Sequence, residues 1–187
     1  MNVYDFDKTI FTRDSSVCFY LYALRKRPAI MKLWPVQIKG VLSYKLGKCC
    51  RDSAKNAVMS YFSLLPDWEE LVESFWDENI KHIAPWYIDA HREDDLIITA
   101  SARQIVESAC RRLKIKNLIA CAMDSATGEL LEPNTKGAEK VKKFRELYGA
   151  AEIEKFYSDS YSDAPLAEIA RESFMVKRGK PQPWKFI

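Results

Sequence analysis

The sequence predicts an α/β fold, in which a parallel sheet is flanked by helices and interrupted by a long helical insert. Three observations predict it. A short apolar strand opens the chain, residues 25–84 show helical periodicity without a convincing strand, and apolar strands alternate with helices after Trp86. Strands separated by helices form parallel sheets with right-handed crossovers. A chain of 187 residues is long enough for one domain, or for one domain with a sizeable insert.

Composition and charge exclude several classes of protein. Apolar residues make up 48% and charged residues 29% of the chain, which is typical of a globular protein and not of a disordered one. The net charge of +3 does not require a polyanionic partner, so we expect no nucleic-acid partner. The five cysteines have no CxxC spacing, which argues against a disulfide framework and a zinc site. The sequence shows no signal-peptide pattern, and we expect a cytoplasmic protein.

The first strand, residues 1–4, ends where two carboxylates begin. Asp5 and Asp7 lie one residue apart and share one side of an extended backbone. Two like charges this close are unfavourable unless a cation lies between them. An isolated Asp-x-Asp is also common in solvated turns, but the aromatic neighbours here indicate the edge of a core.

The helical insert follows this strand. Asp and Ser residues in 12–16 can cap a helix that starts near Val17. Near the end of the insert, residues 68–76 form an amphipathic helix. Its predicted apolar face consists of Trp68, Leu71, Val72, Phe75 and Trp76.

Residues 25–55 of the insert are strongly basic, with Asp52 as their single acid. Apolar residues, among them Trp34, lie between the basic ones. One interpretation is a solvated helical face over an ordinary buried stripe. The other is a surface that meets anionic lipid or an anionic substrate. Lys32 and Lys39 interrupt the apolar residues too early for a transmembrane span.

The alternation after Trp86 begins with a buried strand at residues 95–99. Ser101 and Gln104 match a capping box that opens a helix over 105–113. The later predicted elements are a strand at 118–123, a turn at 124–128 with Leu130 and Leu131 forming a small flap, a helix at 137–148 stopped by Gly149, a strand at 153–157, a helix at 165–171 and a last strand at 174–176.

Polar side chains follow several of these strands. In an open parallel sheet, ligands bind beyond the carboxyl ends of the strands. The residues expected there are Asp5, Asp7, Thr99, Asp159 and Asp163, with Lys136 at the start of a helix. Carboxylates alone would repel a phosphate, but Mg²⁺ held by Asp5, Asp159 and the Asp7 carbonyl would bind a phosphoryl group. Thr99 and free helix N–H groups can hold phosphate oxygens, while Lys136 neutralises further charge.

Four segments together resemble the motifs of the haloacid dehalogenase superfamily, specifically its phosphoserine phosphatase-like branch (subfamily IB). They are residues 5–9, 97–101, 136–137 and 158–163, in that order along the chain. The resemblance spans nearly the whole chain. It implies a Rossmann-like core domain of residues 1–12 and 86–187, with an all-helical cap domain, residues 13–85, inserted after the first strand.

The resemblance also implies roles for individual residues. Asp5 is then the nucleophile that forms an aspartyl-phosphate, and Asp7 is the general acid and later the base. Thr99 binds phosphate and Lys136 clamps its charge. The metal ligands expected for Mg²⁺ are Asp5, Asp7, Asp159 and Asp163, the last of which orients Lys136 or a metal-bound water. Ser101 competes with Thr99, but the predicted capping box favours Thr99.

Substrate contacts are expected at Asp14, Arg51 and Ala100. Phosphoserine phosphatases carry a Glu at the position of Asp14 and a cap Arg for the substrate carboxylate, a role that Arg51 or Arg25 could take. Residues 12–15 look more like the same segment in other members of this branch. Some of those members resemble phosphatidylglycerophosphate phosphatases, which act on lipid head groups. The substrate is therefore expected to be a small phosphorylated metabolite or a lipid head group.

The sequence thus predicts a Mg²⁺-dependent phosphatase whose cap selects the substrate. Phosphate transfer to an alcohol instead of water is an open alternative on the same site. A non-catalytic anion-binding or membrane-surface module that uses the basic cap is another. In either case peripheral contact with an anionic membrane is a further expectation.

Overall fold

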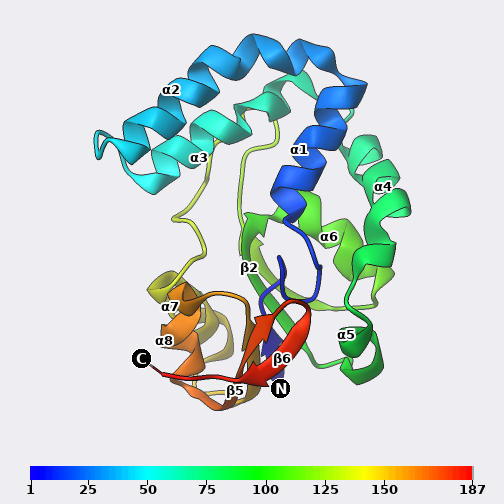
Figure 1. Ribbon diagram of the computed structural model, residues 1–187, viewed down its shortest axis with the longest axis vertical. Coiled ribbons are helices and arrows are strands. Elements are labelled where there is room, and N and C mark those ends of the chain that lie inside the picture. Colours follow the sequence, from blue (N-terminus) through cyan, green and yellow to red (C-terminus); the bar gives the residue numbers. More distant parts are fainter. Residues whose placement is uncertain (187) are drawn as a thin grey trace.

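The computed structural model describes residues 1–186 and contains one six-stranded sheet (Figure 1). The strand order is β3-β2-β1-β4-β5-β6, and all pairs are parallel except β5 with β6. The strands are β1 (Asn2–Tyr4), β2 (Leu96–Ala102), β3 (Asn117–Cys121), β4 (Ile153–Ser158), β5 (Ala170–Lys177) and β6 (Lys180–Pro183). The predicted α/β fold with a mostly parallel sheet is confirmed.

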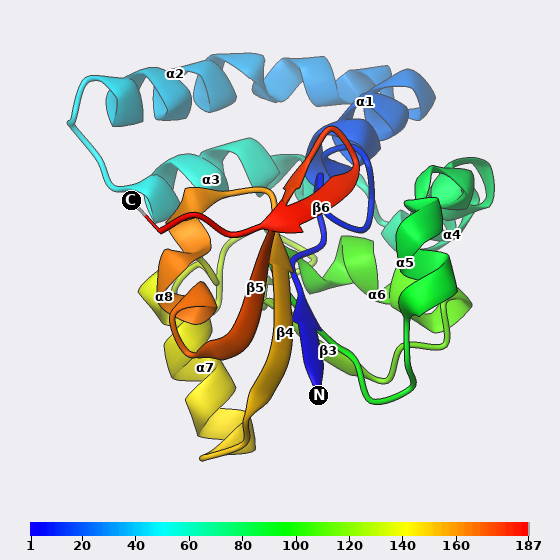
Figure 2. The same cartoon turned by 60° about the horizontal axis from the view of Figure 1, so that its bottom comes forward.

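Helices cover both faces of the sheet (Figure 2). Successive side chains of a strand point to opposite faces, so Val3 packs in one hydrophobic cluster and Tyr4 in the other. The first cluster includes residues of α7 (Ala138–Tyr148) and α8 (Ala164–Ala167). The second includes residues of α5 (Pro85–Ala90) and α6 (Arg103–Arg112). Burial on both faces explains why β2 reads as a continuous apolar run.

The insert after β1 is helical, as predicted. Its elements are α1 (Ser15–Lys26), the 3₁₀ turn η1 (Pro28–Leu33), α2 (Trp34–Lys45), α3 (Arg51–Met59), η2 (Ser60–Leu64), α4 (Trp68–Asn79) and η3 (Ile80–His82). Asp14 caps α1 by accepting a hydrogen bond from the Val17 N–H at 3.0 Å. The predicted apolar face of α4 is buried from Leu71 onward.

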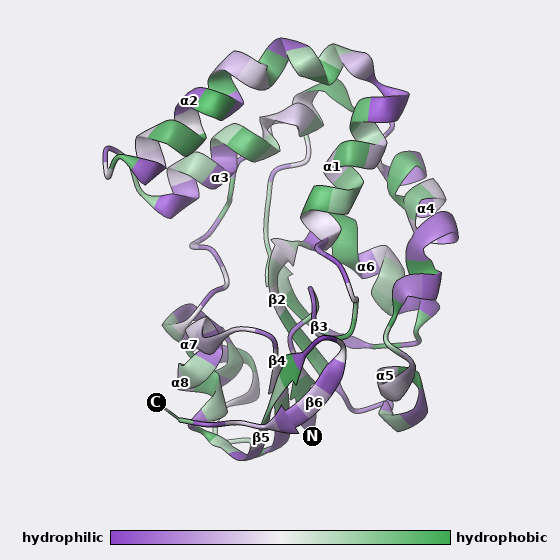
Figure 3. Ribbon diagram, in the orientation of Figure 1, coloured by the Kyte–Doolittle hydropathy of each residue, from purple (hydrophilic) through white to green (hydrophobic). Residues whose placement is uncertain are grey.

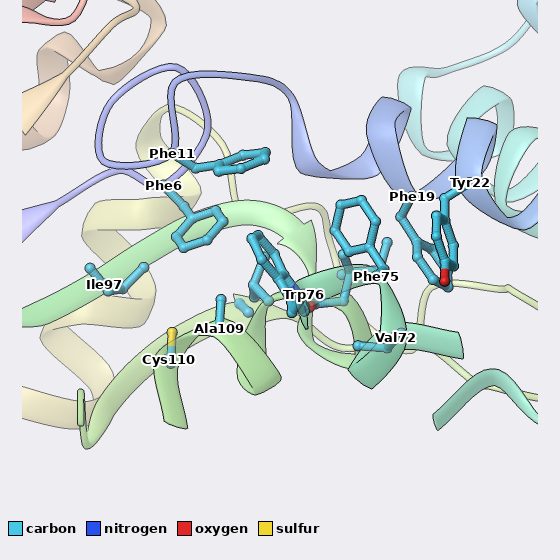
Figure 4. Close-up of a cluster of buried hydrophobic side chains, with 14 of the residues drawn as sticks. Phe6, Phe11, Phe19, Tyr22, Val72, Phe75, Trp76, Ile97, Ala109 and Cys110 are labelled. Carbon is cyan, nitrogen blue, oxygen red and sulfur yellow. Dashed lines mark hydrogen bonds between the residues drawn. The ribbon is translucent and has the colours of Figure 1, made fainter. Parts of the chain in front are cut away.

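Two helices of the insert, α1 and α4, pack on the core rather than away from it. The Trp76 indole of α4 donates a 2.6 Å hydrogen bond to the carbonyl of Ile105 in α6. Figure 4 shows its ring among Phe6 and Phe11, which follow β1, and Phe75. One hydrophobic cluster therefore joins insert and core, and the cap boundary at residues 13–85 stays a prediction. The pair α2 and α3 forms the outer part of the insert.

The C-terminal region differs from the prediction. The helix expected to run to Arg171 ends at Ala167, because residues 170–177 pair with β4 and form β5. Strand β6 was not predicted. It returns through a two-residue turn at Arg178 and Gly179, whose φ angles of 52° and 73° are those of a tight hairpin.

The predicted flap is present as a short turn. Met123 and Leu130 form an isolated antiparallel bridge, and the Gly128 N–H bonds the Asp124 carbonyl at 2.8 Å. Gly128 lies so close to α3 that a Cβ there would be 2.0 Å from the Met59 carbonyl oxygen. The flap therefore contacts the outer helices of the insert.

Candidate active site

A polar cavity of about 230 Å³ lies at the carboxyl edge of the sheet. Its lining residues are Asp5, Asp7, Lys8, Asp14, Thr99, Ala100, Lys136, Lys140, Asp159, Ser160, Ser162 and Asp163. All six residues predicted as catalytic or metal-binding are among them. Segments far apart in the sequence meet here because β1, β2 and β4 are parallel neighbours whose carboxyl ends share one edge.

A buried ion-pair network lies at the floor of the cavity. The Lys140 ammonium donates to Asp5 Oδ1 at 2.6 Å and to Asp163 Oδ2 at 2.8 Å. The Ser158 hydroxyl also donates to Asp163 Oδ2, at 2.8 Å. The side chains of Lys140 and Asp163 are 2% and 4% exposed. A buried charge is tolerated only when it is paired and hydrogen-bonded, and each charge here is.

Burial and neighbouring charges act on the protonation of these groups. The pKa of Asp5 is raised to about 7, mainly by burial and also by the charges of Asp163 and Asp7, although Lys140 acts to lower it. Burial by itself lowers the pKa of Lys140, but the two carboxylates raise it above its ordinary value. The cluster of carboxylates thus favours an additional cation near Asp5.

The lysine that pairs with Asp5 is Lys140, which the sequence did not single out, and the predicted role of Lys136 in clamping phosphate charge stays a prediction. Lys136 also lines the cavity, but it precedes α7, whereas Lys140 lies in the first turn of that helix. Gly137 makes the approach possible, since its φ of 61° is unfavourable for other residues and a Cβ there would lie 3.3 Å from the Ser162 carbonyl oxygen. The sequence carried a signal: Lys140 shares a helix face with the buried Phe144, four residues later.

Two serines hold the Asp7 carboxylate. The Ser15 N–H donates to Asp7 Oδ1 at 2.7 Å, and the Ser101 hydroxyl donates to Oδ2. The hydroxyls of Ser15 and Ser16 both lie within hydrogen-bond distance of Ser101 Oγ, at 3.2 and 3.1 Å. Burial raises the pKa of Asp7, and the hydrogen bonds from Ser101 and Ser15 lower it in part. The sequence did not predict these contacts with Asp7, and it indicated Ser101 only as a helix cap or a phosphate ligand, because the contacts join the start of α1 to the end of β2.

The predicted capping box at Ser101 is wrong. Ala102 is the N-cap of α6 and makes no side-chain cap bond, while the Gln104 amide bonds the Met123 carbonyl instead. Ser101 still belongs to β2. A β-bulge in β2 causes the difference, and such bulges redirect side chains next to binding sites.

The β2 bulge also positions Thr99. Ile98 pairs with Ile119 and Ala102 with Cys121, so three residues of β2 lie opposite one residue of β3. Inside this bulge the Ser101 N–H donates to Thr99 Oγ1 at 3.1 Å. Thr99 is buried at the cavity wall. Its predicted role in binding phosphate stays a prediction.

Two of the three residues predicted to contact substrate reach the cavity. Asp14 lines it, caps α1 and lies 3.7 Å from the Lys8 ammonium. Ala100 lines it as well. Arg51 is not in the lining, and its guanidinium bonds the Tyr44 hydroxyl at 3.2–3.3 Å.

A cap lysine that the sequence did not single out contacts this edge. Lys55 of α3 donates to the Ala100 carbonyl at 2.6 Å and to Asn134 Oδ1 at 2.8 Å. Burial lowers the pKa of Lys55. Helix α3 is thereby fixed directly to the bulge of β2 beside Thr99.

The donor atoms at the cavity suit a hard divalent cation. Among residues 1–186, no three His, Cys, Asp or Glu side chains gather into a metal site by themselves. Mg²⁺ requires fewer, because it binds through one or two carboxylates and completes its shell with waters and substrate oxygens. Asp5 and Asp159, which both line the cavity, would supply carboxylates, and the predicted third oxygen is the Asp7 carbonyl. Asp163 accepts from Lys140 and Ser158 through Oδ2, and its predicted role as a metal ligand stays a prediction.

The fold and the cavity define a class of protein: an α/β protein with a mostly parallel sheet and an aspartate directly after its first strand, at a polar cavity. The chain belongs to the haloacid dehalogenase-like hydrolase family, whose model matches residues 3–168. No curated protein matches the sequence. Solved structures are similar to this chain in fold, at sequence identities of 17–18% for three of them.

Three solved structures share this fold at low sequence identity. A protein of unknown function from Bordetella pertussis Tohama I is 18% identical, with a TM-score of 0.75 over 92% of this chain and 87% of that one. A phosphoserine phosphohydrolase-like protein from Francisella tularensis is 17% identical, with a TM-score of 0.52 over 92% and 86%. A phosphoserine phosphatase, solved as a phospho-aspartyl intermediate analogue, is 17% identical with a TM-score of 0.50 over 91% and 83%. The fold is thus phosphoserine phosphatase-like.

Proposed function

We propose that the chain is a Mg²⁺-dependent phosphatase that hydrolyses a phosphate monoester through an aspartyl-phosphate on Asp5. The observation that carries this proposal is the convergence of Asp5, Asp7 and Lys140 in one polar cavity. A solvent-exposed binding module would need neither a second carboxylate beside the first nor a buried lysine paired with it. Family membership supports hydrolysis as the class of reaction.

In the first step, an Asp5 carboxylate oxygen forms a bond to phosphorus while the bond from phosphorus to the leaving oxygen breaks. Asp7 gives its proton to that oxygen, so the substrate leaves as an alcohol. Burial raises the pKa of Asp7, which favours a carboxyl that holds a proton before the step. Its bonds to Ser15 and Ser101 fix the direction in which the proton points.

In the second step, a water oxygen attacks phosphorus and the bond to Asp5 breaks. Asp7, now a carboxylate, takes the proton of the water, and inorganic phosphate leaves. Lys140 neutralises charge beside Asp5 throughout, and the Thr99 hydroxyl faces the cavity as a donor to phosphate oxygens. Asp5, Asp159 and the Asp7 carbonyl would hold Mg²⁺, which would supply electrostatic stabilisation of the transferring phosphoryl group.

We further propose that the cap selects the substrate, a phosphorylated metabolite or a lipid head group. Support comes from Lys55 and Asp14, which bring α3 and α1 to the cavity. Helices that cover a site exclude bulk water and contact the part of the substrate that does not react.

The test is phosphate release by the purified chain from phosphorylated amino acids, sugars, nucleotides and lysolipids. We expect release with Mg²⁺, loss of release with a chelator and recovery when Mg²⁺ is returned. Undiminished release under chelation would contradict the metal dependence. Products formed with added alcohols separate hydrolysis from phosphate transfer. Absence of turnover across the panel would favour the non-catalytic module.

A further inference from the structure

Helix α2 attaches to the protein through a narrow stripe of small and polar contacts. Gln37 is its only buried residue among those described; its amide donates to the Val58 carbonyl at 3.1 Å and accepts from the Tyr20 hydroxyl at 2.7 Å. Three residues later, Gly40 touches Ala57 of α3, where a Cβ would lie 2.4 Å from the Ala57 Cβ. In most surface helices the face that packs on the protein is apolar, but in α2 this face is formed by small and polar residues.

The apolar side chains of α2 point outward instead. Trp34, Ile38, Leu42 and Leu46 recur every four residues, which places them on one stripe of the helix. Ile38 and Leu42 are 55% and 52% exposed. Val41 lies beside Trp34 and widens this outer stripe, and Figure 3 shows hydrophobic residues interleaved with hydrophilic ones along α2. A contiguous exposed apolar surface of this kind marks an interaction site.

An apolar groove adjoins the outer stripe. It has a volume of about 510 Å³ and lies between α1 and α2, with α3 at its base. Leu21 and Leu24 of α1 face Ile38 and Leu42 of α2 across it. The groove and the outer stripe therefore form one continuous apolar surface.

Positive charge surrounds this surface. From Arg25 to Arg51 the sequence contains eight Lys and Arg residues and no Asp or Glu. Lys32, Lys39 and Lys45 are exposed, and within residues 1–186 none of them pairs with a carboxylate. Apolar side chains between unpaired lysines suit the boundary between anionic head groups and acyl chains.

We propose that α2 and the adjoining groove dock onto an anionic lipid bilayer, with the outer stripe buried among acyl chains and the lysines at the lipid phosphates. This proposal does not rest on the proposed phosphatase activity. A second copy of the chain fits the surface less well, because a two-fold contact would bring the same unpaired lysines together. No helix within residues 1–186 has the length and apolar character to cross a membrane, so contact occurs at the bilayer surface.

Helix α2 is placed to make this contact. Figure 2 shows it as the outermost layer of the molecule, with α3 between it and the sheet. The basic segment and the outer stripe occupy the same element, so one helix can approach a planar surface without rearrangement of the core.

The test is co-sedimentation of the full chain with vesicles of phosphatidylcholine, with and without phosphatidylglycerol. We expect binding to the anionic vesicles that weakens as salt rises. Ile38→Glu and Leu42→Glu should each lower the partition coefficient about tenfold, since each removes one buried aliphatic side chain. Lys39→Gln and Lys45→Gln should each lower it about fivefold.

The matched control is Leu147→Glu, which changes a 68% exposed leucine on α7, far from α2 in sequence. It should bind vesicles as the wild type does, and circular dichroism checks that every variant is folded. Equal binding to neutral vesicles, or binding that Ile38→Glu leaves intact, would overturn the proposal. Light scattering provides the remaining outcome: a dimer that Leu42→Glu dissociates, without vesicle binding, would assign the surface to a second copy.

Discussion

The cavity and the outer face of α2 depart from the usual rule of burial in opposite directions. In the cavity, Lys140 and Asp163 are buried although charged residues are ordinarily exposed. On α2, Ile38 and Leu42 are exposed although large aliphatic residues are ordinarily buried. Both departures are unfavourable in isolation, so each indicates a surface on which the protein acts.

The difference lies in how each departure is compensated. The buried charges form three mutual hydrogen bonds within the chain, among Lys140, Asp5, Asp163 and Ser158. The exposed aliphatic side chains of α2 have no such compensation within residues 1–186, since α2 uses Gln37 and Gly40 for its contacts. The buried charges are therefore paired within the folded chain, whereas no described residue covers the outer stripe.

The largest expected effect is on catalysis, from Asp5→Asn. An amide cannot form the acyl-phosphate, so turnover of an aryl phosphate with Mg²⁺ should fall by at least about 10⁴-fold. Asp7→Asn should also abolish turnover but should still form some acyl-phosphate from a substrate with a good leaving group. Asp89→Asn is the control, because Asp89 is exposed on α5. Substantial activity in Asp5→Asn would make the nucleophile assignment wrong.

The next effect concerns the buried ion-pair network. Lys140→Met leaves two buried carboxylates without their cation, and we expect a loss of about 3–5 kcal/mol in the free energy of unfolding. Lys136→Met should change it by about 0.5 kcal/mol or less, since no hydrogen bond of the Lys136 side chain is present within residues 1–186. Urea titration of both variants measures the difference. Equal losses would mean that Lys136 shares the role that contacts assign to Lys140.

A smaller effect should follow from Ser101→Ala. Loss of the hydroxyl leaves Asp7 with the Ser15 N–H as its donor, so its carboxyl is oriented less well. We expect turnover of an alkyl phosphate to fall about tenfold. An aryl phosphate, whose leaving group needs little proton donation, should lose less. The measured quantity is the loss of alkyl phosphate turnover divided by the loss of aryl phosphate turnover. Equal losses for the two substrates would argue against a role of Ser101 that acts through Asp7. Ser63→Ala, on η2, serves as the control.

The smallest effect should come from the outer stripe itself. Leu42→Ser should change the free energy of unfolding by about 0.5 kcal/mol or less, because the side chain is 52% exposed. Val72→Ser on α4 should cost about 2–4 kcal/mol, since Val72 is 2% exposed in the core. Thermal unfolding of the two variants compares them. A large loss in Leu42→Ser would mean that α2 uses this face for folding.

Sequence alone determined the features that depend on local patterns. Alternating strands and helices predicted the parallel sheet, and the position of Asp5, Asp7 and Asp159 directly after strands predicted their convergence. Asp14 before an apolar helix predicted the start of α1. These predictions succeeded because side-chain period, capping and strand ends are set by neighbours along the chain.

Only the tertiary structure decided the features that depend on packing between distant segments. It placed Lys140 between Asp5 and Asp163, because this contact depends on how α7 packs against the ends of β1 and β4. It placed Ser101 on Asp7 instead of at a helix cap, because Ser101 lies in the bulge of β2 and Ala102 is the N-cap of α6. It also showed that the apolar residues of α2 point outward. Periodicity shows that a helix has an apolar stripe, but it does not show which side of the helix packs against the neighbouring helix.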